Sequence, residues 1–272
     1  MNAVRGKIRD GDYLALSEKA LSIATGNLMD ESRIKPGFLA KLLASVWTRI
    51  IWGYILGPLC HLRGETIRRI RNYPKVEGSI HKEAALRTVG LLDALLYTSE
   101  GGIDCSNLPE SYVCLPLRNP ERIAEEVRLA VKEKLGKNIK VVIVDTDKTY
   151  SYRGLHISSR KSCLKGIYGL GFIAYLFGRA LRWKARATPI ALSGSTVNVE
   201  EALNVAELAN RFRGHGAGRT VWEMAERFGV PPNQVSWRMI ESVEHKPIVI
   251  IRRRAKRLKG RKPIKVDQSI QK

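Results

Sequence analysis

The pattern of apolar and polar positions predicts strands and helices in both halves of the chain. An apolar run at 13–17 follows a Gly-Asp turn and predicts a strand. A helix is predicted to start at Asn119, because Pro and an acidic residue follow it, and to end at Gly136. The apolar run 139–144 predicts a second strand that ends at Asp145-Thr146, before a polar, Tyr-rich and basic loop.

The most apolar stretch lies at 37–59, where Trp47, Ile50, Ile51, Tyr54 and Ile55 recur at helical spacing. Two basic residues interrupt the run and Pro58 ends it. A membrane span needs about twenty mostly uncharged residues, so we predict a buried or dimer-facing helix. A helix lying on a membrane surface is the alternative.

The segments that follow are more ambiguous. The stretch 62–72 predicts a helix with a basic face, which solvation explains and phosphate contact would also explain. From His81 to Tyr97 the first half favours a helix, and from Val89 onward a strand fits as well. Four glycines between 166 and 178 do not form a dinucleotide fingerprint, and we interpret them as sites of close packing.

The last third of the chain predicts a helix, a loop and a helix pair. Asn198 starts a helix that runs to about Phe212, and the Gly-rich loop 213–219 that follows suits a phosphate cradle. The segment 220–246 has helix-turn-helix rhythm, with its second helix starting at Val235. Any tight pair of helices has the same rhythm, and DNA readout is the alternative.

The end of the chain predicts one more strand and a tail. The apolar run 247–251 predicts a short final strand. Residues 253–272 form a basic C-terminal tail, for which contact with RNA, with DNA or with nothing are all open.

Composition adds a strong positive charge to this picture. The chain has 272 residues, 44% of them hydrophobic, which fits one large domain or two smaller ones. Lys and Arg number 47 against 26 Asp and Glu, a formal net charge of +21. This excess predicts an anionic partner such as nucleic acid, a nucleotide or acidic lipid. The charge-rich surface of some thermophile proteins explains it equally well.

The cysteines and the start of the chain narrow the class of protein. The four cysteines form no Cys-x-x-Cys pair and the five histidines lack metal-finger spacing, so we predict no zinc site. The N-terminal residues lack the apolar region of a signal peptide. We expect a cytoplasmic protein with reduced thiols and no membrane partner.

Two carboxylates stand where an apolar run meets a turn. Asp104 lies in the stretch 101–107, and Asp145 precedes the hydroxyl of Thr146. Ligands bind at strand ends in open sheets, and such hard oxygens suit Mg²⁺ or Mn²⁺ holding the phosphates of a nucleotide. Aspartates that cap helices or form turns give the same local pattern.

Several short motifs, in order from residue 11 to residue 252, resemble the coenzyme F420-0:γ-glutamyl ligase family. The matching stretches are Gly11-Asp12-Tyr13-Leu14-Ala15-Leu16, Gly101 to Asn107, Leu115-Pro116-Leu117 with Asn119-Pro120, Val141 to Thr146, Arg153-Gly154, the Gly-rich loop at Gly214, and Pro247 to Arg252. The resemblance implies an α+β fold with mixed sheets and flanking helices in two intertwined subdomains. It also implies a homodimer. Residues 1–252 would form the ligase-like domain, with 220–246 as an insertion.

The resemblance also implies a reaction. Family members join L-glutamate to coenzyme F420-0 in γ-linkage, with GTP as co-substrate and a divalent metal, Mg²⁺ or Mn²⁺, through an acyl-phosphate. The implied metal ligands are Asp104, Asp145, Thr146 and His215. The implied nucleotide contacts are Lys19, Asn107, Gly214, Gly216, Gly218 and Arg219, and Arg153 would contact phosphate or substrate.

Three departures from the family pattern bear on this reading. Ile23 stands where the family has a nucleotide-facing Lys, for which Lys19 would substitute from about one helical turn away. His215 holds the place of a metal-binding Glu, and a neutral imidazole binds Mg²⁺ more weakly than a carboxylate. The family's N-terminal Gly-Leu-Pro nucleotide strand has no counterpart.

Two function classes follow from these residues. The first is an amide-bond-forming, GTP-dependent ligase of the γ-glutamyl type. The second is a catalytically inactive or repurposed homologue that binds nucleic acid or nucleotide through its basic surface and helix pair.

Overall fold

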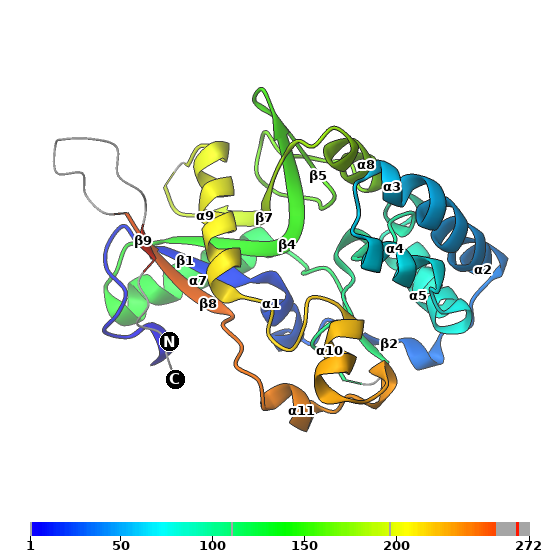
Figure 1. Ribbon diagram of the computed structural model, residues 1–272. Coiled ribbons are helices and arrows are strands. Elements are labelled where there is room, and N and C mark those ends of the chain that lie inside the picture. Colours follow the sequence, from blue (N-terminus) through cyan, green and yellow to red (C-terminus); the bar gives the residue numbers. More distant parts are fainter. Residues whose placement is uncertain (1, 110, 196, 254–264, 267–272) are drawn as a thin grey trace.

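The computed structural model describes residues 2–109, 111–195, 197–253 and 265–266 (Figure 1). It is an α+β fold in which a seven-stranded mixed sheet lies beside a helical part. A second, two-stranded sheet joins β2 to β3. The strands are β1 Tyr13–Ser17, β2 Leu28–Asp30, β3 Tyr112–Cys114, β4 Lys140–Tyr152, β5 Leu155–Ser158, β6 Tyr168–Gly169, β7 Lys184–Ser193, β8 Ile248–Arg252 and β9 Lys265–Val266.

Helices cover the sheet and build the second part of the molecule. The α-helices are α1 Glu18–Ala24, α2 Phe38–Leu42, α3 Gly57–Leu59, α4 Gly64–Arg71, α5 Lys75–Thr88, α6 Leu91–Ala94, α7 Pro120–Leu135, α8 Phe172–Ala180, α9 Val199–Arg213, α10 Val221–Phe228 and α11 Trp237–Glu241. A π-helical segment, η3 Leu43–Leu56, joins α2 to α3. Short 3₁₀ turns are η1 Asn2–Val4, η2 Glu31–Arg33, η4 Glu100–Gly102 and η5 Pro232–Gln234.

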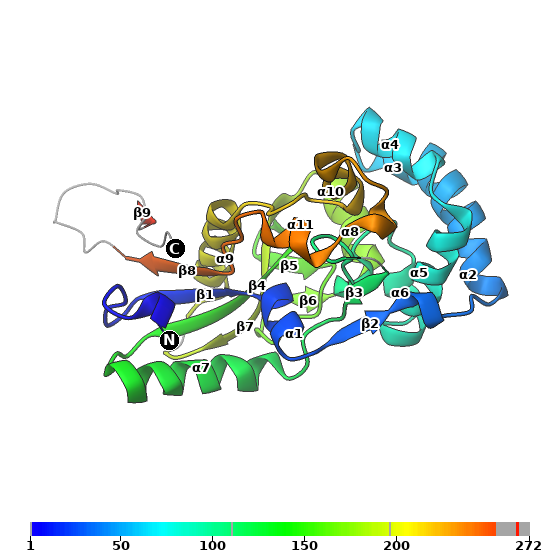
Figure 2. The same ribbon diagram turned by 90° about the horizontal axis from the view of Figure 1, so that it is seen from below.

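The sheet is buried between two helices, which explains the continuous apolar runs in its central strands. Its order is β6-β5-β4-β1-β8-β9, with β7 also paired to β4, and β1 runs parallel to β4. Alternate residues of β1 and β4 pack on α7 at one face and on α9 at the other (Figure 2). Strands covered on both faces are apolar throughout. The predicted strands at 13–17 and 247–251 and the helices from Asn119 and Asn198 are confirmed.

Strand β4 does not end at Asp145, contrary to the prediction. It continues to Tyr152, and the register with β7 shifts between Asp145 and Lys148. Asp145 pairs with Thr188 and Lys148 with Ala187, so two residues of β4 form a bulge. The polar residues that indicated a loop are the bulge and the half-buried strand beyond it. This bulge lies directly past Ser17, the last residue of β1, which pairs with Val144.

The apolar stretch at 37–59 is one continuous helical segment that runs from α2 to α3, but it is not buried as a whole. Its inner side packs Trp52 edge-on against aromatic residues of the helical part, including Tyr97 and Phe172. Its outer side leaves Ile50, Tyr54 and Ile55 exposed, because the neighbouring helices cover only one side. The dimer-facing alternative stays a prediction.

Phe38–Leu59 is also long and apolar enough, by length and composition, to cross a membrane. Only 33% of its most apolar window is buried inside the protein. Core helices of soluble proteins pass the same test, so this finding assigns no location.

Two further expectations were wrong in detail. The stretch 81–97 contains no strand: α5 runs to Thr88 and α6 follows, with Val89 as the helix cap. The second helix of the predicted helix pair begins at Trp237, with the Ser236 side chain as its N-cap, and not at Val235. Val235 instead lies buried in the small core between the two helices.

A buried ionic network fixes the loop that carries Asp104. Lys82, which is fully buried, donates to Glu100 Oε1 at 2.6 Å and to the carbonyls of Ala94 and Leu96. His81 Nε2 lies 3.1 Å from Glu100 Oε2. Burial by itself raises the pKa of Glu100. Lys82 and His81 lower this pKa by more, so that the net value is about 2. The same carboxylate raises the pKa of His81 against the effect of burial.

Glu100→Gln tests this network. A depressed carboxyl pKa stabilises the fold above pH 4.5, and that contribution, up to about 3 kcal/mol, is lost as the pH falls toward 2. The variant should be less stable at neutral pH, because Lys82 loses its counter-ion. Its free energy of unfolding should also fall less between pH 4.5 and pH 2 than that of the wild type. Chemical denaturation from pH 2 to 7 measures both effects. Glu133→Gln, at an exposed position, is the control. The same loss of unfolding free energy at low pH in wild type and Glu100→Gln would contradict the assignment.

Gly178 tests the close-packing interpretation of the glycines at 166–178. A Cβ at Gly178 would overlap the ring of the buried Tyr150. Gly178→Ala should therefore destabilise the fold by about 1–3 kcal/mol, measured by thermal unfolding, as overpacking does in other cores. Gly64→Ala is the matched control, because no atom lies within 4 Å of its Cβ position. Equal melting temperatures for the two variants would rule out this interpretation.

Candidate functional site

One cavity of about 500 Å³ collects most of the predicted site residues. It lies where β1 ends beside the β4 bulge, and α1, the loop after α9, α11 and the segment before β8 complete it. The predicted residues among its lining are Lys19, Asp104, Asn107, Asp145, Thr146, Gly214, His215, Gly216, Gly218 and Arg219. Residues from four separate stretches of sequence therefore share one cavity, although their chemical roles stay predictions.

Asp104 is held by its own loop and by α1. Its backbone bridges to Cys114, the last residue of β3, and its Oδ1 accepts the backbone N–H of Ser106 at 2.7 Å. The ammonium of Lys19 pairs with Asp104 Oδ2 and also donates to Ser106 Oγ at 2.8 Å. Burial raises the pKa of Asp104, but Lys19 lowers it more, so the carboxylate is ionised.

Asp145 is held by Arg160, a residue that the sequence motifs did not reveal. Arg160 Nε lies 2.7 Å from Asp145 Oδ2, and its other nitrogens donate to Glu18 Oε1 at 2.5 Å and to the Gly101 carbonyl. Only 4% of Arg160 is exposed. Burial by itself lowers the pKa of this guanidinium. Glu18 and Asp145 raise it by more, so that the net pKa is above its usual value. One buried cation thus joins the start of α1, strand β4 and the loop 101–107.

Asn107 lies in the cavity wall, but its amide does not point to a free ligand position. Its Oδ1 accepts the amide of Ala217 at 2.7 Å, and its Nδ2 donates to the Gly218 carbonyl at 3.1 Å. A Cβ at Gly216 would lie 2.7 Å from Asn107 Oδ1, and the φ there is +58°. Asn107 therefore braces the Gly-rich loop, and some of the loop's amides are already used inside the protein.

The cavity is richer in positive charge than the motifs indicated. Lys148, Arg213 and Lys246 line it in addition to Lys19 and Arg219, against the two carboxylates Asp104 and Asp145. Burial, and then the nearby Arg219, lower the pKa of His215, so its imidazole is neutral at pH 7. Arg213 is the first residue of the Gly-rich loop 213–219, and Lys246 precedes the last strand. These positions were the only signal in the sequence.

The residues present fit a divalent metal only in part. In the described part of the chain, no three His, Cys, Asp or Glu side chains are grouped to hold a metal ion. Asp104 and Asp145 both line the cavity, but each is already paired with a cation. Mg²⁺ commonly binds one or two carboxylates together with substrate phosphates. This donor set fits a metal that arrives with a nucleotide, and does not fit one held by the protein alone.

Arg153 does not belong to the cavity. It lies in the tight turn between β4 and β5 with a φ of +46°, and its guanidinium lies over the ring of Tyr152 at 5.2 Å. Its proposed contact with phosphate or substrate receives no support from this position. Because β4 continues as a strand past the bulge to Tyr152, Arg153 lies away from Asp145. The predicted loop after Asp145 would have allowed the two residues to lie closer together.

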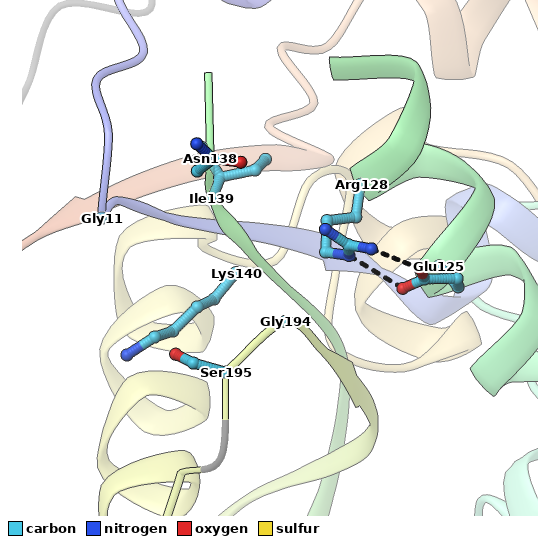
Figure 3. A pocket seen from close by; sticks show the side chains of 8 residues that line it. All are labelled: Gly11, Glu125, Arg128, Asn138, Ile139, Lys140, Gly194 and Ser195. Atoms are coloured by element: carbon cyan, nitrogen blue, oxygen red, sulfur yellow. Dashed lines mark hydrogen bonds and ion pairs between the residues drawn. The ribbon is translucent and has the colours of Figure 1, made fainter. Parts of the chain in front are cut away.

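A second cavity, of about 470 Å³, lies near the first residue of β4 and the end of β7 (Figure 3). Its charged side chains include Lys140 and the pair Arg128–Glu125, joined at 2.5 Å. It contains none of the predicted site residues among its lining. The first cavity therefore remains the candidate site.

The chain is similar in sequence to known proteins. The family model described as F420-0:Gamma-glutamyl ligase matches residues 1–252. An uncharacterized protein of Methanocaldococcus jannaschii is 33% identical over 256 residues, 90% of this chain and 86% of that protein. A coenzyme F420:L-glutamate ligase of Methanopyrus kandleri is 28% identical over 152 residues, which are 53% of this chain and 51% of that enzyme. With 252 matched residues, the chain belongs to the F420-0:Gamma-glutamyl ligase family.

Proposed function

We propose that this protein is a ligase that adds L-glutamate in γ-linkage to coenzyme F420-0, with GTP as co-substrate. One observation carries the proposal: Asp104 and Asp145 line the same cavity as Lys19 and the Gly-rich loop. The family to which the chain belongs supports the ligase chemistry.

The cavity residues suit phosphoryl transfer by charge and position. The γ-phosphate of GTP would pass to the carboxylate of F420-0, GDP would leave, and the amine of glutamate would then displace phosphate from the acyl-phosphate. Lys148, Arg213 and Arg219 offer positive charge to the phosphate oxygens. Such fixed charges stabilise the transition state because they need no reorganisation.

A Mg²⁺ or Mn²⁺ ion would be held by Asp104, Asp145, Thr146 and His215 together with oxygens of GTP, and would screen the phosphate charges. Asp104 is the more accessible of the two carboxylates, because its partner Lys19 is partly exposed. Asp145 is paired with a buried Arg and is the less free to change ligands.

The nucleic-acid alternative has less support from the geometry. Helix α11 has five residues, about 7.5 Å at 1.5 Å per residue, which is short for a recognition helix. Its residues Trp237 and Ile240 face the cavity. Retention on DNA or RNA that falls with salt would still favour this alternative.

We also propose a homodimer. The exposed apolar side of the segment Phe38–Leu59 offers a surface for a second copy, with Phe38, Ile50, Tyr54, Ile55 and Leu59 all accessible.

Asp104→Asn tests the proposed function. Wild-type protein should form glutamylated F420-0 from GTP, glutamate and Mn²⁺, detected by mass spectrometry, and the variant should lose at least about a hundredfold in rate, the size typical of lost charge stabilisation. GTP with Mn²⁺ should raise the melting temperature of the wild type more than that of the variant. Asp10→Asn, at an exposed ion pair, should match the wild type. If the wild type forms no product and shows no thermal shift at millimolar GTP, the proposed ligase function is wrong.

A second prediction concerns the metal alone. Titration of Mn²⁺ followed by electron paramagnetic resonance should show no tight site without nucleotide, and one site once GTP is present. The reason is that the described residues lack a complete ligand set. Tight binding of Mn²⁺ to the nucleotide-free protein, abolished by Asp104→Asn, would show that the carboxylates suffice without phosphate.

A further inference from the structure

The residues that line the cavity are of two chemical kinds. Asp104, Asp145 and several basic side chains are charged. Ala20, Ile23, Trp237, Ile240 and Pro247 form an apolar set. A ligand that matches both kinds has a flat apolar body joined to a negatively charged chain.

Trp237 is the largest side chain of the apolar set, and it is 44% exposed. Three residues further along α11, Ile240 is buried in the small core with Met224 and Val235. Because residues three apart lie on one side of a helix, Ile240 fixes the side of α11 from which Trp237 reaches the cavity. A large, partly exposed aromatic side chain at the cavity offers a ligand a flat apolar surface.

The helix pair that carries Trp237 is braced against the rest of the protein. The side-chain oxygen of Asn107 accepts the backbone N–H of Ala217, just before the pair. The backbone N–H of Asn107 donates to Met224 Sδ at 3.2 Å. Arg227 donates to the Gly216 carbonyl at 3.3 Å. Arg69 of α4 pairs with Glu226 at 3.0 Å, so α10 is tied to the helical part as well, beside which it lies in Figures 1 and 2.

We propose that Trp237 stacks on the flat heteroaromatic ring of the phosphate-bearing ligand and thereby sets which ligand the cavity accepts. The inference rests on the proposed function, which supplies two ligands of this chemistry: the guanine of GTP and the deazaflavin of F420-0. Ile23, which also lines the cavity, adds a second large apolar side chain to the lining. An aromatic side chain stacks with any flat ring and needs no specific hydrogen bond.

Calorimetric titration of the full-length protein with GTP, F420-0 and inorganic triphosphate tests this role. Trp237→Ala should weaken the binding of at least one ring-bearing ligand by about tenfold or more, as the loss of one stacked ring does elsewhere. Triphosphate binding should change by less than about twofold, since stacking contributes nothing to it. Trp237→Phe should restore most of the affinity, and Trp222→Ala, in the neighbouring helix, is the matched control.

Each outcome decides the matter. A loss for GTP alone places guanine on Trp237, and a loss for F420-0 alone places the deazaflavin there. Equal losses for all three ligands, or none, overturn the inference, as does a wild type that binds no ring-bearing ligand better than triphosphate. Trp237-dependent affinity without glutamylated product overturns the proposed function alone. Product formation with unchanged affinities in Trp237→Ala overturns only the stacking role.

Discussion

The buried guanidinium of Arg160 is the interaction on which the candidate site depends. It joins Glu18 after β1, Asp145 in the β4 bulge and the Gly101 carbonyl of the loop that carries Asp104. Removing one partner of a buried pair costs about 3–5 kcal/mol, because the remaining charge is left without compensation. The three segments therefore keep their relative positions as long as this cation is present, and the two carboxylates of the cavity are placed together.

The parts of the fold that could be predicted are those with local causes. The strand at 13–17 and the helix from Asn119 were predicted within about a residue, because apolar spacing, Pro120 and Gly136 define them locally. The bulge in β4 could not be predicted in the same way. It exists because β7 supplies the partner residues beyond Asp145, and that partner lies some forty residues later in the sequence.

The candidate site shows the same division. The motifs identified which residues meet in the cavity, and ten of the eleven predicted residues line it. They did not reveal Arg160, since a long-range ion pair leaves no periodic trace, nor that the side-chain amide of Asn107 braces a loop. Arg153 lies outside the cavity because β4, predicted to end at Asp145, continues to Tyr152.

The helix pair at 220–246 shares a small core with the Gly-rich loop, formed by Met224, Val235 and Ile240 together with Ala217 of the loop. The paired ions Glu18, Asp145 and Arg160 lie outside this core. A substitution on the cavity side of the helix pair therefore leaves the partners of these ions in place. The residues that hold the carboxylates and the helix that carries Trp237 are thus separate parts of one site, and the second can change without the first.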